Sequence, residues 1–122
     1  MHWLAKVALT ILGNAFALWL ANLFIPGFVV HATVSQLLLI ALALAFLNWF
    51  LKPLLTLVFG PIIILTLGIG ILIVNAVILL LLPILVDHID FLRQSINIQN
   101  IPALILATVL VSAVNLVVHV IE

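Results

Sequence analysis

Asparagines that stand inside long apolar stretches are the residues whose chemistry most needs an explanation. One stands in each of four such stretches: Asn14, Asn48, Asn75 and Asn115. An amide in apolar surroundings without a hydrogen-bond partner is costly, so each should face protein or water. Either the amides hydrogen-bond between helices, or they form a polar cluster that lines a conduit or a headgroup site. A proton relay is not expected, because an amide does not titrate.

A second group of candidate residues follows Asn48 and consists of one cation and several residues that affect the backbone. It comprises Lys52, Pro53, Gly60, Pro61, Thr66 and Gly68. Proline lacks an N–H, so Pro53 is expected to end a helix, with Lys52 reaching for headgroup phosphates. Gly60-Pro61 leaves backbone groups unpaired, the Thr66 hydroxyl is able to bond them, and Gly68 permits close helix approach. The alternative is a structural turn between two halves of the chain.

Catalytic and metal-binding patterns are missing from the sequence. His31, Asp87, His88 and Asp90 carry metal-competent groups, but their spacing fixes no coordination geometry, and we expect a solvated loop. The chain has no cysteine, hence no thiolate chemistry. We find no nucleophile–base pair, no paired carboxylates and no phosphate-binding glycine loop. The sequence therefore predicts no enzyme, no metal and no cofactor.

The composition identifies lipid as the surroundings of this chain. Of its 122 residues, 69% are hydrophobic and only 5% are charged. A soluble domain is about 25% charged, and a core of this size cannot hide so many apolar side chains. Three basic residues balance three acidic ones, so no basic face is available for nucleic acid.

The apolar stretches predict an all-α membrane protein with four transmembrane helices in a single domain. A hydrocarbon core of about 30 Å requires about 20 apolar residues in a helix. The predicted spans cover residues 4–25, 34–51, 61–85 and 101–121, and residues 86–100 form an outer loop. We expect the first span to be retained and not cleaved as a signal, because its hydrophobicity continues to Val30.

The third span is preceded by an apolar segment that is hard to divide. Residues 54–86 are 33 uncharged residues. As one helix they would extend about 50 Å, too long for one crossing and too short for two. We expect Gly60-Pro61 to break the segment, with a short half-helix at 54–59 before the span. A single tilted helix kinked at Pro61 is the alternative.

Charges near the ends of the spans predict the orientation. Lys6 and Lys52 lie on one side, and Asp87, Asp90 and Arg93 lie on the other. Because Lys and Arg are enriched on the cytoplasmic side, both termini should be cytoplasmic.

The two halves of the chain are alike. Asn14-Ala15 recurs as Asn75-Ala76 after 61 positions, and Asn48 recurs as Asn115 after 67 positions. This predicts two tandem helical hairpins related by an axis along the membrane normal. Residues 96–99 alternate in polarity like a strand that would pair with 28–31; an amphipathic interfacial segment is the alternative.

Small residues recur every four positions on three of the predicted spans. They are Gly13, Ala17 and Ala21, then Ala41 and Ala45, then Ala103 and Ala107. Such faces allow helices to approach closely. Packing within one subunit and packing between subunits explain them equally well.

The run from Asn48 to Ala76 resembles a known family. Asn48-Trp49-Phe50-Leu51-Lys52-Pro53 is followed by Pro61-Ile62, Leu65-Thr66-Leu67-Gly68 and Asn75-Ala76, with Pro26-Gly27-Phe28 upstream. This pattern is similar to bacterial four-span phage holin proteins of the mycobacterial superfamily IV type, over nearly the whole chain. The resemblance implies a multi-pass protein of the bacterial plasma (inner) membrane. It supplies no catalytic or binding residues.

Three functions stay open. The resemblance and the small-residue faces favour a homo-oligomer with a pore-forming or structural role; any pore would lie between copies, because four short helices leave little room within one. The asparagines and the broken third segment favour a small transporter or lipid-handling protein. The third function is a partner or stress-response membrane protein without transport, with residues 87–100 as its contact surface.

Overall fold

A computed structural model describes residues 2–121, except for the side chain of His119. The elements are α1 (His2–Phe24), β1 (Phe28–Val30), α2 (Val34–Val58), α3 (Gly60–Leu65), α4 (Ile71–Asp87), the 3-10 helix η1 (Asp90–Leu92), β2 (Ile96–Ile98) and α5 (Ile101–Ile121). Apart from the two strands of three residues each, the expected helical class is confirmed.

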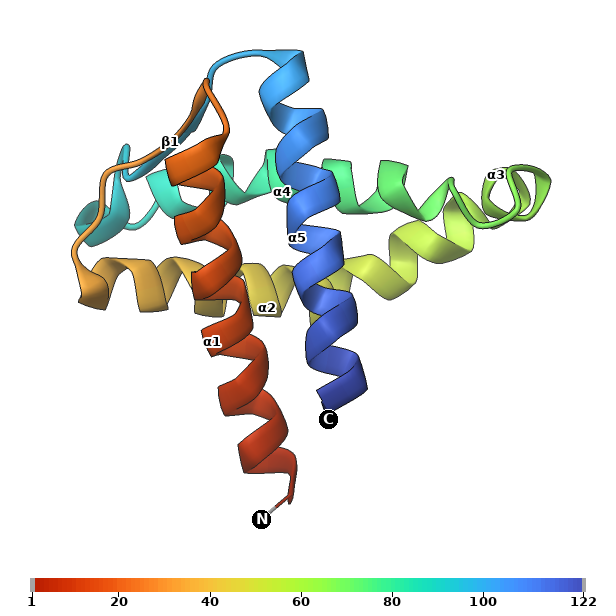
Figure 1. Cartoon of the computed structure of the whole chain (residues 1–122), viewed down its shortest axis with the longest axis horizontal. Coiled ribbons are helices and arrows are strands. Elements are labelled where there is room, and N and C mark those ends of the chain that lie inside the picture. Colours follow the sequence, from red (N-terminus) through yellow and green to blue (C-terminus); the bar gives the residue numbers. More distant parts are fainter. Residues whose placement is uncertain (1, 122) are drawn as a thin grey trace.

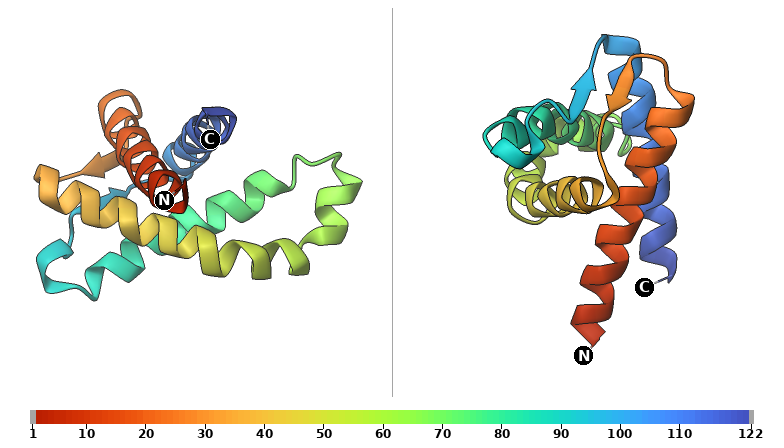
Figure 2. Two further views of the ribbon diagram at one scale, coloured as in Figure 1. Left: turned by 90° about the horizontal axis from the view of Figure 1, so that it is seen from below. Right: turned by 90° about the vertical axis from the view of Figure 1, so that its left-hand side faces the viewer.

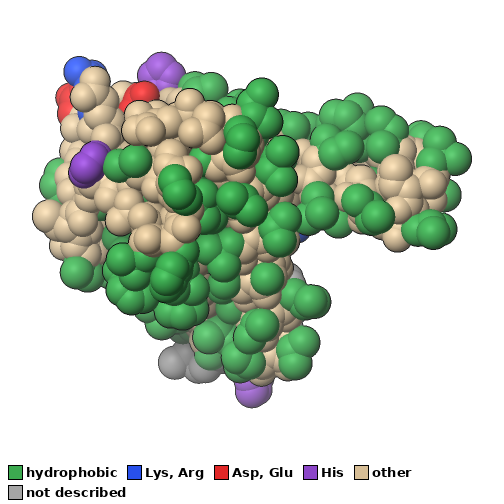
Figure 3. Space-filling model, turned by 45° about the horizontal axis from the view of Figure 1, so that its top comes forward, with side chains coloured by type: hydrophobic (Ala, Val, Ile, Leu, Met, Phe, Trp, Pro, Cys, Tyr) green, Lys and Arg blue, Asp and Glu red, His purple; other side chains and the backbone are tan. Residues whose placement is uncertain are grey.

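Among the described residues, three helices are long and apolar enough to cross a membrane. They are α1, α2 and α5, with 23, 25 and 21 residues, whereas α4 is a shorter apolar helix of 17 residues. At about 1.5 Å per residue, α4 extends roughly 26 Å, slightly less than a hydrocarbon core of about 30 Å. Apolar side chains dominate the visible surface (Figure 3), as expected for a protein whose solvent is lipid.

The four long helices form two crossed layers (Figure 1). α1 lies beside α5 in one layer and α2 lies beside α4 in the other, and the two helices of each layer run in opposite directions (Figures 1 and 2). The two helices of each predicted hairpin therefore lie in different layers and pack across each other. The start of α1 and the end of α5 both lie away from the strands (Figure 1).

The strands join the two hairpins at one end of the molecule. β1 and β2 pair antiparallel, with Phe28 opposite Ile98, Val29 opposite Asn97 and Val30 opposite Ile96. The strand pair therefore brings together one segment from each half of the chain. The pairing predicted between residues 28–31 and 96–99 is confirmed.

Small residues bring the helices into close contact within the subunit. Ala17 and Ala21 of α1, Ala41 and Ala45 of α2, and Ala103 and Ala107 of α5 are at most 1% exposed. A Cβ added to Gly13 of α1 would lie only 2.6 Å from Cγ2 of Val118 on α5. Contacts inside one subunit therefore account for these small-residue faces.

The segment between Lys52 and Ile71 differs from its prediction. α2 continues through Lys52 and Pro53 to Val58, so Pro53 does not end a helix and most of the expected half-helix 54–59 belongs to α2. The predicted break at Gly60-Pro61 before a span at 61–85 is not confirmed, because Gly60 opens the six-residue α3 and α4 begins only at Ile71. Proline removes one helical hydrogen bond, and a continued helix keeps the other backbone groups paired in apolar surroundings.

The end of α2, α3 and the following turn project from the body as an arm, which we define as residues 54–70 (Figure 2). Apart from Thr66, its exposed side chains are apolar. Leu57, Ile64, Leu65 and Leu67 are 76–94% exposed. Such a surface is stable only against lipid or another protein.

Candidate functional site

Three of the four predicted asparagines meet around one cavity, which we call the vestibule. Its volume is about 480 Å³. It is lined by Thr10, Asn48, Trp49, Lys52, Ile71, Leu72, Asn75, Ser112, Asn115, Leu116 and Val118. These residues come from the first half of α1, the second half of α2, the start of α4 and the end of α5, so the vestibule lies at the end of the molecule opposite the strands.

Helical spacing places the polar side chains on the vestibule wall. Lys52 follows Asn48 by four residues on α2, and Asn115 follows Ser112 by three residues on α5. Residues three or four apart lie on the same face of a helix. Asn75 of α4 adds a third wall.

One hydrogen bond ties two of these walls together. The Asn75 Nδ2 donates to the Ser112 Oγ at 2.8 Å. The side chains of Asn48 and Asn115 are half-buried and form no hydrogen bond with any residue of the described range 2–121. Their amides are therefore available to water or to a bound molecule.

Lys52 is the cationic group of the vestibule. Its side chain is half-buried, and it has no ion pair or hydrogen bond with the residues that the structure describes. It lies within α2 and not at its end, because the helix continues to Val58. Helical residues therefore precede and follow Lys52, and the helix holds it on the vestibule wall.

The vestibule ends inside the protein. A small extension of about 10 Å³, lined by the same three asparagines with Thr108 and apolar residues, reaches inward; such a space holds about one water molecule. Farther along α4 toward the strands, Leu79, Leu82 and Val86 are at most 2% exposed and fill the interior. Among the described residues, this apolar packing closes the inner end of the vestibule.

Asn14 lies apart from the other three asparagines. Its side chain is fully buried on α1, and its Nδ2 donates to the Ala41 carbonyl of α2 at 3.3 Å. Its Oδ1 is buried without a hydrogen-bond partner among the described residues. Asn14 therefore links helices and does not line the vestibule.

The remaining predicted motif residues shape the connection between α2 and α4. The Thr66 hydroxyl donates to the Ile62 carbonyl and accepts from the Gly70 N–H, both at 2.8 Å. Gly68 has φ of +93°, and an added Cβ would meet nothing within 4 Å. The expectation that Gly68 allows close helix approach is wrong; its left-handed conformation is what favours glycine. Pro53, Gly60, Pro61, Thr66 and Gly68 do not line the vestibule.

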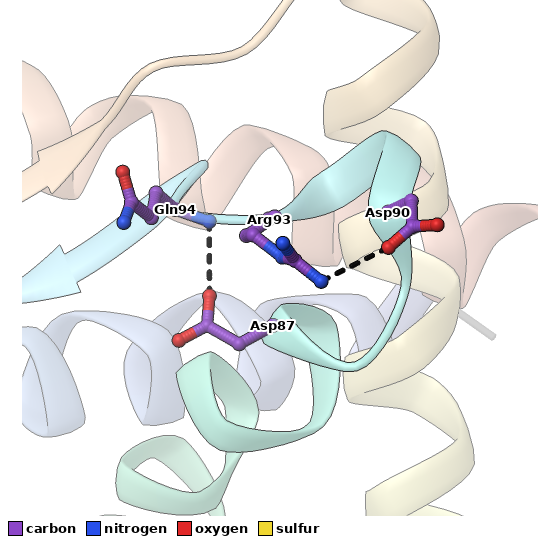
Figure 4. Close-up of polar contacts among 4 residues, drawn as sticks. All are labelled: Asp87, Asp90, Arg93 and Gln94. Atoms are coloured by element: carbon purple, nitrogen blue, oxygen red, sulfur yellow. Dashed lines mark hydrogen bonds and ion pairs between the residues drawn. The ribbon is translucent and has the colours of Figure 1, made fainter.

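The charged end of the molecule lies around η1 and β2 (Figure 4). The Asp87 carboxylate accepts the Gln94 N–H at 2.9 Å, and Arg93 pairs with Asp90 at 3.0 Å with both side chains exposed. An exposed pair of this kind contributes little to stability. In the described part of the chain, no three His, Cys, Asp or Glu side chains come together as metal ligands.

Two polar residues that form structural hydrogen bonds were not predicted from the sequence. Ser112 binds Asn75, and the only signal for it was its place three residues before Asn115 on one helical face. Asn22 Oδ1 accepts the N–H of Val30, the last residue of β1, at 2.9 Å and so ties the end of this strand to α1. Asparagine near a Pro-Gly pair is a common turn signal.

Comparison with known proteins gives one match. The family model described as "Mycobacterial 4 TMS phage holin, superfamily IV" matches residues 5–117. No curated protein and no solved structure matches the chain.

Proposed function

The chain belongs to the mycobacterial 4 TMS phage holin family, superfamily IV, and on this premise we propose that it binds a polar solute or a lipid headgroup in the vestibule, as a small transporter or lipid-handling protein. The chain is a small integral membrane protein of the holin type. One observation supports the proposal most: three helices contribute amides to a single closed-ended cavity, and α2 contributes a lysine that has no partner in the described part of the chain. Amides are costly in lipid unless they are paired, so a polar occupant gives these side chains partners.

The proposed orientation places the vestibule on the cytoplasmic side of the plasma membrane. Lys6 and Lys52 belong to the end that holds the vestibule, and Asp87 and Asp90 belong to the end that holds the strands. The enrichment of positive residues on the cytoplasmic side supports this orientation, with both termini inside. An occupant would then enter from the cytoplasm or from the inner leaflet.

Molecules that co-purify with the protein test this proposal. Wild type, the double variant Asn48→Leu/Asn115→Leu and the control Asn97→Leu are purified in one mild detergent, and retained lipids and solutes are identified by mass spectrometry. Asn97 lies on the exposed surface of β2, away from the vestibule. We expect wild type and the control to retain a polar molecule that the double variant loses. An identical set in all three proteins would refute the proposal.

A homo-oligomeric pore is the second candidate function. The apolar arm at residues 54–70 supports it, because this surface is free to contact another copy, and the family description supports a holin-type role. The closed-ended vestibule means that any pore would lie between copies. Reconstitution into dye-loaded vesicles tests this candidate: dye release that rises with protein content is expected for a pore, and vesicles that stay sealed at high protein content exclude a constitutive one.

A further inference from the structure

Resting on the proposed function, we infer that the occupant of the vestibule is an anionic phosphate group, held by Lys52 and by the amides of Asn48 and Asn115. A lipid headgroup and a soluble phosphate ester share this chemistry. The lining favours the lipid, for the reason given below, and the experiment separates the two sources.

The first argument is the charge on the vestibule wall. Lys52 is half-buried and lacks an acidic partner among residues 2–121. The two carboxylates of this range, Asp87 at the end of α4 and Asp90 in η1, lie at the end of the molecule away from the vestibule. A half-buried ammonium loses part of its hydration free energy, and without a counter-charge no other interaction compensates for that loss. An anion in the same cavity supplies the missing partner, and charge-assisted hydrogen bonds to phosphate are strong.

The second argument is the number of unused donors. The amides of Asn48 and Asn115 each carry two N–H groups and have no hydrogen-bond partner within the described chain. Ser112 accepts from Asn75 through its oxygen, so its own O–H proton is left to donate. A phosphate presents several acceptor oxygens at once, whereas a cation would meet Lys52 as a like charge.

The third argument is the apolar part of the wall. Ile71, Leu72 and Leu116 line the vestibule beside the polar groups, and Trp49, which is 42% exposed, stands at its edge. Tryptophan and lysine are typical of the membrane interface, where headgroups meet acyl chains. A molecule with a charged head and an apolar body matches this mixed wall better than a free phosphate does.

Trp49 makes the inference measurable, because it lines the vestibule within three residues of Lys52. Trp3 and Trp19 are replaced by Phe, and the protein is reconstituted in phosphatidylcholine with increasing fractions of brominated phosphatidylglycerol or brominated phosphatidylcholine. Bromine quenches a nearby tryptophan. We expect Trp49 quenching to saturate at a low fraction of the anionic lipid, and Lys52→Gln to lower that affinity about tenfold.

Matched variants control for charge and folding. Lys6→Gln removes an exposed lysine that does not line the vestibule and should leave the affinity unchanged. Lys52→Arg keeps the charge and should retain selectivity, and circular dichroism checks that each variant is helical. Release of the brominated lipid by glycerol phosphate would assign the site to phosphate from either source, and no release would assign it to the lipid.

Equal quenching by both brominated lipids, or the same affinity in Lys52→Gln and wild type, would overturn the inference. The proposed function and the phosphate assignment are refuted by different results. If the vestibule retains a neutral molecule that the Asn48→Leu/Asn115→Leu protein loses, the proposed function stands and the phosphate assignment falls.

Discussion

The Asn75 amide and the Ser112 hydroxyl, 2.8 Å apart, join α4 to α5 at the wall of the vestibule. The sequence left two roles open for its asparagines, interhelical bonding and polar lining, and this bond fulfils both. It links two helices, and it belongs to the polar lining. Within residues 2–121, the neighbouring Asn48 and Asn115 have no such partner, which separates amides that support the structure from amides that are available to a ligand.

Replacing either partner of this bond should weaken the contact between α4 and α5. We expect Asn75→Leu and Ser112→Ala each to cost about 0.6–2 kcal/mol, the range found for interhelical bonds in membranes. Unfolding by a denaturing detergent measures the change. Ser35→Ala, at an exposed position on α2, is the control and should be neutral. Because both variants remove the same bond, the double variant should cost less than their sum.

The contact between Gly13 and Val118 should not tolerate added volume. A Cβ at Gly13 would lie 2.6 Å from Val118 Cγ2, and the β-branched valine has little freedom to move. We expect Gly13→Ala to destabilise the protein by about 1–3 kcal/mol, and Val118→Ala to recover part of that loss. Gly60→Ala, where nothing lies within 4 Å, is the control. Equal effects of the two glycine variants would contradict close packing of α1 on α5.

Gly68 should respond to conformation and not to volume. Its φ is +93°, in the region that residues with a Cβ rarely adopt. We expect Gly68→Ala to cost about 1–2 kcal/mol, and Gly68→Asn to cost less, because asparagine tolerates left-handed conformations better. Thermal unfolding in detergent gives both values. A stabilised Gly68→Ala protein would show that the turn between α3 and α4 has another conformation.

The proposed orientation predicts which side of the membrane each end reaches. The chain has no cysteine, so single cysteines report without background. In intact cells, a membrane-impermeant thiol reagent should label Gln94→Cys, on the exposed loop before β2, and should reach Lys6→Cys only after permeabilisation. The reverse pattern would place both termini outside.

The sequence supports prediction of the membrane class, the strand pair and the candidate asparagines. Lipid solvation explains the first, because 69% hydrophobic content leaves no soluble alternative. Alternating polarity at residues 96–99 was sufficient for the strand. That Asn48, Asn75 and Asn115 meet while Asn14 lies elsewhere was not predictable, because all faces of these helices are apolar and the sequence does not fix how each helix is rotated.

Helix boundaries between α2 and α4 were the weakest part of the prediction. Pro53 was expected to end a helix, yet α2 passes through it. Helix breaks are predicted from proline and glycine, because in water a solvated loop competes with the helix at these residues. In apolar surroundings a loop costs unpaired backbone groups, so the chain keeps its helix as far as Val58 and turns only around Phe59 and at 66–70.

The closed-ended vestibule is the central claim, and its accessibility to water from each side tests it most directly. Ser112→Cys changes a wall residue with little change in shape, and Ala107→Cys, at a fully buried position, is the unreactive control. An impermeant thiol reagent is added to inside-out and right-side-out membrane vesicles. We predict that Ser112→Cys is modified only in inside-out vesicles. Modification from both sides would reveal a through-channel, and modification from neither would show a dry interior; each result would contradict the account.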